Sequence, residues 1–231
     1  LSIIFKVFKD FLPNNFQFFS FWFFLCFFFQ LFFSYSIIYH FTQNNKYSTI
    51  SSFIFLLSPI LLYRIPIHIS LVGQWIILAS FFGETIKKEK IRFYYWISIL
   101  TISSLIHFYF TLMLSLIYLI FEIDKFLTNK KLFKLLKEIF IPFVFLLLIM
   151  YLSGYFVIPL TDSLGYGYGY YKANILSFFD PVSTIDNFSW SNFLPNLPGS
   201  RGEHEGFGYL GLGGIILFIL LLFYFIKREP L

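Results

Sequence analysis

Long apolar runs without a single charged residue constrain the fold of this chain more than any other feature. Residues 16–41 and residues 139–160 contain no Asp, Glu, Lys or Arg, and about 20 apolar residues are enough to cross the hydrocarbon core of a bilayer. The chain is 58% hydrophobic and only 13% charged over 231 residues, whereas a soluble domain is about 25% charged. We therefore predict an all-α, polytopic transmembrane helical protein.

Polar turns divide the chain into about seven membrane segments, several of which are short. Residues 93–121 are long for one span, and we interpret them as a hairpin of two short helices that turns near His107. The short segments require burial among other helices or a locally thinner membrane. The predicted segments are residues 16–41, 49–63, 67–82, the two halves of 93–121, 139–160 and 212–226.

The distribution of lysine and arginine orients these segments, because short cytoplasmic loops collect basic residues. With the hairpin, the basic stretches 83–92 and 122–138 lie on the same side, opposite the long polar stretch 161–211. A single long helix would place the two basic stretches on opposite sides. We predict that residues 1–160 are a transmembrane helical region, that residues 161–211 are an extracytoplasmic loop, and that residues 212–231 are the last transmembrane helix with a cytoplasmic tail.

The loop at residues 161–211 is the only long stretch that is unsuited to a bilayer interior, since it is rich in carboxylates, glycine and proline. Its alternating Gly–Tyr run at residues 165–171 lacks the Lys-Ser/Thr pair of a phosphate-binding loop. Tyrosine is typical of the membrane interface, and it also offers a flat face and a hydroxyl to a sugar ring. Trp190 extends this aromatic surface. We interpret the loop as a lid over a cavity that faces the membrane.

Ionisable side chains within membrane segments are costly and mark candidate functional sites. Arg64 has no carboxylate near it in the sequence, and its guanidinium suits a phosphate or a carboxylate. The alternative is that Arg64 extends to the outer headgroups. His107, at the predicted turn, is a candidate proton-transfer group or phosphate ligand, or a histidine bonded to a backbone carbonyl at a helix break. His68 and Tyr109 join Arg64 and His107 as candidate substrate-binding residues.

Glu203 and Glu205 end the loop just before the last segment and are the other candidate substrate-binding residues. In an extended chain their side chains point to the same side, where they would hold a divalent cation or act as acid and base. The alternative is a solvated loop in which Glu205 favours the start of the next helix. The histidines are too few for a metal site of three or four ligands, so no metal-ligating set is predicted.

The net charge of +5 comes largely from the basic loops, which we interpret as a topology signal that attracts anionic headgroups. The aromatic residues between these charges belong to bilayer packing. We therefore expect membrane lipid as a partner and no nucleic acid.

Three stretches of the chain resemble a known group of proteins. They are PILLYRIPIHISLVGQWIIL at residues 59–78, the stretch ending in LIHFYFTLM at residues 96–113, and the stretch from YYKANILSFFDP to GEHEGFGYLGLG at residues 170–213. They resemble uncharacterised bacterial multi-pass inner-membrane proteins, which in turn resemble the large GT-C type glycosyltransferases. The closing GEHEGFGYLGLG is the most specific part of the resemblance.

The resemblance implies a membrane glycosyltransferase that transfers a sugar from a polyprenyl-phosphate donor, on the extracytoplasmic face of the bacterial inner membrane, to a cell-envelope saccharide or protein. Enzymes of this class carry their catalytic acid in the first outer loop. Because the chain begins at Leu1 rather than Met, we expect that loop upstream and predict no catalytic residue within the chain. The alternatives are a transporter or flippase, or a non-catalytic assembly protein, for lipid-linked saccharides.

Overall fold

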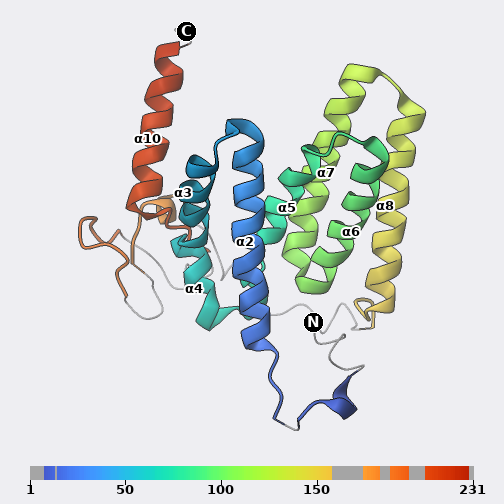
Figure 1. Ribbon diagram of the computed structural model, residues 1–231, viewed down its shortest axis with the longest axis horizontal. Coiled ribbons are helices and arrows are strands. Elements are labelled where there is room, and N and C mark those ends of the chain that lie inside the picture. The colour runs from blue at the N-terminus through green and yellow to red at the C-terminus, as the bar shows by residue number, and fades with distance from the viewer. Residues whose placement is uncertain (1–7, 14, 158–173, 183–187, 198–205, 229–231) are drawn as a thin grey trace. The chain divides into compact units, whose positions relative to one another are not determined.

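The computed structural model describes residues 8–13, 15–157, 174–182, 188–197 and 206–228, and helices make up most of them (Figure 1). No β-strand occurs in these ranges, so the predicted all-α class is confirmed. The α-helices are α2 (Phe19–Thr42), α3 (Asn45–Leu56), α4 (Pro59–Ile67), α5 (Trp75–Glu84), α6 (Glu89–Ile106), α7 (Phe108–Asn129), α8 (Leu132–Leu152) and α10 (Gly211–Arg228). Short 3-10 helices are η1 (Lys9–Phe11), η2 (Ile69–Val72) and η3 (Ile175–Phe178).

Two helices, α2 and α8, are long and apolar enough to cross a membrane. A third candidate span is the pair Asn45–Leu56 and Pro59–Ile65, whose axes differ by 45° at the break between them. The segments Ile69–Glu84 and Gly211–Lys227 are apolar but shorter. The chain therefore has two or three candidate spans by length and composition, and the count of seven stays a prediction.

The chain divides into two compact units. The first comprises Leu1–Leu56 and Ile65–Val157, and the second comprises Leu57–Arg64 and Ile158–Leu231. In the first unit, α2 packs on α3 and α5, while α6, α7 and α8 pack against one another (Figure 1).

The core of the first unit lies between α5, α6 and α7 and is built from large apolar side chains. Trp96, Leu100 and Leu114 are almost fully buried there. A Cβ added to Gly83 would lie 2.9 Å from the ring of Tyr95, so only glycine allows this approach of α5 to α6. The hydroxyl of Tyr95 donates to the carbonyl of Ala79 over 2.7 Å, which fixes the same pair of helices.

The predicted turn near His107 is confirmed, because α6 ends at Ile106 and α7 begins at Phe108. The backbone of His107 is extended. The ring Nδ1 of His107 accepts a hydrogen bond from the backbone N–H of Tyr109 over 3.2 Å, and this bond satisfies one of the free donors at the start of α7.

Residues 122–138 differ from the sequence interpretation, which gave them as a basic segment between membrane runs. They are helical except for a short break, at which Lys130 adopts a left-handed backbone with φ of 55°. Apolar residues continue on one face of this stretch, which lets α7 and α8 extend beyond the uncharged runs. The extension brings charged side chains from both helices face to face.

Candidate functional site

Arg64 lies near the end of α4 in the second unit, and it is only 8% exposed. Its guanidinium carbon lies 5.7 Å from the ring centre of Tyr63. An arginine side chain stays charged even when buried, and a buried charge is costly unless it has a charged or hydrogen-bonding partner. The position therefore favours an anion.

Aromatic residues of the polar loop cover the segment that carries Arg64. The ring centres of Tyr63 and Phe207 are 4.3 Å apart, and Trp190 lies 6.2 Å from Phe207. Tyr209 follows at 6.5 Å from Phe207 and is 1% exposed. Its hydroxyl has no hydrogen-bond partner among the described residues, which is uncommon for a buried polar group. The second unit thus holds a buried cation and a buried hydroxyl under an aromatic cover.

Glycines hold the end of the loop close to its neighbours. Gly211 has a φ of +79°, and a Cβ there would lie 3.3 Å from the ring of Pro59. A Cβ at Gly208 would lie 2.9 Å from the hydroxyl of Ser177. A left-handed backbone and such close approaches both favour glycine. Part of the GEHEGFGYLGLG motif therefore has a structural reason.

His68, His107 and Tyr109 come together in the first unit. The rings of His107 and Tyr109 are 4.6 Å apart. Burial lowers the pKa of His107, and the positive charge of His68 lowers it further. His107 is therefore neutral at pH 7 and able to accept a hydrogen bond at one ring nitrogen and donate at the other. Tyr109 is exposed beside it. The predicted association of these three residues is consistent with this geometry.

The predicted carboxylates Glu203 and Glu205 lie outside the described residues. Within the described part of the chain, no group of three or more His, Cys, Asp or Glu side chains is arranged to hold a metal ion.

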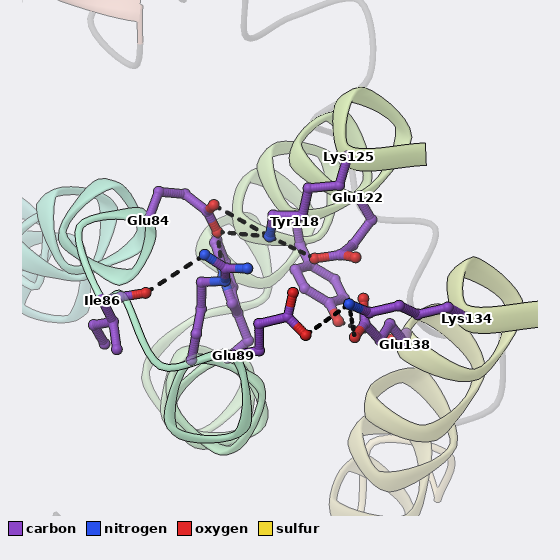
Figure 2. A network of polar contacts seen from close by, with 10 residues as sticks. Glu84, Ile86, Glu89, Tyr118, Glu122, Lys125, Lys134 and Glu138 are labelled. Atoms are coloured by element: carbon purple, nitrogen blue, oxygen red, sulfur yellow. Dashed lines mark hydrogen bonds and ion pairs between the residues drawn. The ribbon is translucent and has the colours of Figure 1, made fainter. Parts of the chain in front are cut away.

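A second polar site joins the ends of α5, α6, α7 and α8, and the sequence interpretation missed it (Figure 2). Glu84 accepts a hydrogen bond from the indole N–H of Trp96 over 2.8 Å. Lys125 bridges two helices, because its ammonium lies 3.1 Å from Glu84 and 2.8 Å from Glu122. We call this site the charged cleft.

The other half of the charged cleft links α6 to α8. Lys134 lies 2.7 Å from Glu89 and 3.9 Å from Glu138. The carboxyl groups of Glu138 and Glu122 are hydrogen-bonded to each other, and Glu122 is 4% exposed. The hydroxyl of Tyr118 donates to the backbone carbonyl of Glu138 over 2.6 Å. Each helix therefore supplies a charge to its neighbours.

One local signal in the sequence indicates this cleft. Glu122 lies one helical turn after Tyr118, which itself follows Leu114 by one turn, so all three share a helix face. A carboxylate on an apolar face is rarely buried unless it is paired. The partners of Glu122 had no such signal, because Glu84 lies 41 residues before Lys125.

Comparison with known proteins gives one family. Residues 1–231 match the model of a family described as a domain of unknown function (DUF6311). No curated protein and no solved structure matches the chain.

Proposed function

We propose that this chain, which belongs to the DUF6311 family, is part of a GT-C-like membrane glycosyltransferase. In this proposal it uses a polyprenyl-phosphate sugar as donor on the extracytoplasmic face of a bacterial inner membrane. The acceptor is a cell-envelope saccharide or protein. About seven membrane segments, several of them short, surround the donor site, and residues 161–211 form the loop above it.

The observation that carries the proposal is the buried guanidinium of Arg64 under the aromatic residues of the polar loop. A planar guanidinium binds a phosphate through two parallel hydrogen bonds. Phe207 and Trp190 lie over Tyr63, which contacts Arg64, and aromatic faces are suited to a sugar ring or an isoprenoid chain. A phosphate esterified to both a lipid and a sugar fits these two chemistries together.

The other candidate residues take supporting roles in this proposal. His68, His107 and Tyr109 offer neutral hydrogen-bonding groups to the donor. Glu203 and Glu205 contact the acceptor, with a divalent cation as an optional partner of their carboxylates. The proposal assigns substrate binding to these residues and assigns no catalytic residue.

The test is transfer of labelled sugar from a polyprenyl-phosphate donor, measured in membranes that contain the native protein. Arg64→Ala should lower transfer by about 10- to 100-fold, because a hydrogen bond to a charged group contributes about 1.5–3 kcal/mol. Arg64→Lys should keep part of the activity, since it retains the charge and loses the bidentate geometry.

Lys137→Gln is the control variant, since Lys137 is an exposed cation on α8 and its loss should leave transfer unchanged. Transfer that is the same in Arg64→Ala as in Lys137→Gln would remove Arg64 from the donor site. Absence of any transfer by the native protein, with a range of donor sugars, would contradict the glycosyltransferase itself.

The second candidate function is transport of a lipid-linked saccharide, and the broken span of α3 and α4 favours it. Discontinuous helices with a charged residue near the break are typical of transporters, and Arg64 lies in the second half of this bent pair. Liposomes separate the two functions. A flippase moves a labelled lipid-linked saccharide between leaflets without an acceptor, whereas a transferase releases the lipid phosphate only when an acceptor is present.

A further inference from the structure

The charged cleft encloses a cavity of about 60 Å³ between α6, α7 and α8. Its lining is almost entirely polar. The residues around it are Glu89, Arg92, Glu122, Lys125, Phe126, Asn129, Lys131, Lys134, Leu135 and Glu138. A second, smaller cavity continues inward between Trp96 and Tyr118 and is closed by Glu122 and Glu138. A polar cavity of this size accepts several water-sized groups.

The inner end of the cavity is rich in negative charge. Glu122 and Glu138 are hydrogen-bonded to each other. Lys125 pairs with Glu122 but is shared with Glu84, and Lys134 lies 3.9 Å from Glu138 while it pairs closely with Glu89. The two inner carboxyl groups therefore have less positive charge around them than the outer carboxylates.

Aromatic rings stand beside these carboxyl groups. Trp96 and Tyr118 are 4.8 Å apart between ring centres, and both line the inner cavity. Aromatic faces together with carboxylates are the typical surroundings of a bound ammonium group. The inner end therefore suits a small cation that brings hydrogen-bond donors.

The rim of the cavity has the opposite character. Arg92 and Lys131 line it, and neither makes an ion pair within the part of the chain that the structure describes. Lys131 is also the residue before the first turn of α8, which contains no acidic residue. The free N–H groups of a helix start favour an anion. The rim is suited to a phosphate.

The cleft lies at one end of a candidate membrane span. Lys134 and Glu138 belong to the first two turns of α8, which is apolar enough to cross a bilayer. At 1.5 Å per residue, these turns lie within about 10 Å of the helix start, which is the depth of the headgroup region. A lipid headgroup is thus the molecule that reaches the cleft most directly.

We propose that the charged cleft binds a phosphate ester of a primary ammonium alcohol, supplied by the headgroup of phosphatidylethanolamine. The ammonium lies at Glu122 and Glu138 beside the two aromatic rings, and the phosphate lies at Arg92, Lys131 and the start of α8. A purely anionic headgroup is repelled by the inner carboxyl groups. A simple cation lacks the group that Arg92 and Lys131 bind.

The test is lipid retention by the native protein in detergent, measured by native mass spectrometry with equal amounts of three lipids. Phosphatidylethanolamine should be retained about five- to tenfold more than phosphatidylglycerol or phosphatidylcholine, which is the range for one or two net hydrogen bonds. Phosphatidylcholine is the sharpest comparison, because its quaternary ammonium cannot donate hydrogen bonds. Equal retention of either comparison lipid would overturn the proposal.

Variants locate the binding to the cleft. Arg92→Gln and Lys131→Gln change rim residues, and each should lower retention of phosphatidylethanolamine about threefold or more. Glu138→Gln should remove the preference for phosphatidylethanolamine over phosphatidylcholine. Lys137→Gln is the matched control, because Lys137 lies on the same helix but does not line the cavity. Rim variants that behave like Lys137→Gln, while their thermal unfolding matches the native protein, would also overturn the proposal.

Soluble phosphoethanolamine distinguishes the two sources of the headgroup. Displacement of the lipid by millimolar phosphoethanolamine would support a site that recognises the headgroup alone. Retention of the lipid under these conditions, with the variant effects intact, would support a site that also requires the acyl chains.

Discussion

The charged cleft and the surroundings of Arg64 solve the problem of a buried charge in different ways. In the cleft, four helices contribute charges of both signs, and most carboxylates have a lysine within 4 Å. In the second unit, a single guanidinium lies beside aromatic rings. A balanced network mainly fixes helices relative to one another, whereas an arginine under an aromatic cover favours an incoming anion. The first arrangement predicts stability effects, and the second predicts effects on substrate binding.

The largest stability effect is expected for Lys125→Met. This change removes the cation shared by Glu84 and Glu122 and leaves Glu122 buried with less compensation. The free energy of unfolding should fall by about 3 kcal/mol, as for other buried pairs broken on one side. Unfolding in mixed micelles with increasing SDS, followed by circular dichroism, measures it. Lys137→Met is the control on an exposed site, and an equal loss in both variants would contradict a stabilising role for the cleft.

A smaller effect is expected for Gly83→Ala, which tests the packing beside the cleft. The new methyl group would lie 2.9 Å from the ring of Tyr95, so α5 and α6 must move apart at a cost of about 1–3 kcal/mol. Gly213→Ala is the counterpart in the second unit, where a Cβ meets nothing within 4 Å, and it should not destabilise α10. The same micelle assay compares them, and equal stability of the two variants would show that α5 and α6 separate freely.

Tyr209→Phe should separate binding from stability in the second unit. The hydroxyl of Tyr209 is buried without a hydrogen-bond partner among the described residues. Its removal should leave stability unchanged or raise it by about 1 kcal/mol, while sugar transfer from the polyprenyl-phosphate donor should fall. A variant that unfolds more easily and transfers sugar normally would assign the hydroxyl a structural role.

The smallest effect is expected for Glu89→Gln at the exposed edge of the cleft. A hydrogen bond from Lys134 lowers the pKa of Glu89 below its ordinary value of 4.5, so the native pair stabilises the fold above that pH and loses its contribution as pH falls through the folded pKa. The variant should lose less than about 1 kcal/mol at pH 7, because the pair is exposed. Unfolding measured at pH 7 and pH 3 checks this, since the difference between native protein and variant should vanish at the lower pH.

Much of the helical framework follows from the sequence, because apolar runs report burial in lipid or protein locally. The turn at His107 was predicted from the length of its run and from the distribution of lysines, and the structure places the break between α6 and α7 there. The break within residues 49–63 was not predicted. It falls between Leu56 and Pro59, where the proline favours the start of a new helix.

The candidate site was predictable only in part. Arg64, His68 and His107 are conspicuous because charged or polar side chains are rare in apolar runs, and the sequence alone identified them. The charged cleft was not, because residues 122–138 have the composition of an ordinary cytoplasmic loop. Their helical continuation buries Glu122, and composition does not report which face of a helix meets a neighbour.

The sequence by itself determined that this chain forms apolar helices suited to a membrane, since that depends on hydrophobicity summed over neighbouring residues. It also determined which few ionisable residues interrupt those helices. Only the tertiary structure decided that Lys125 meets Glu84 and that Phe207 lies on Tyr63. Partners so distant in the sequence are selected by the packing of whole helices and loops, and no local pattern of residues records that choice.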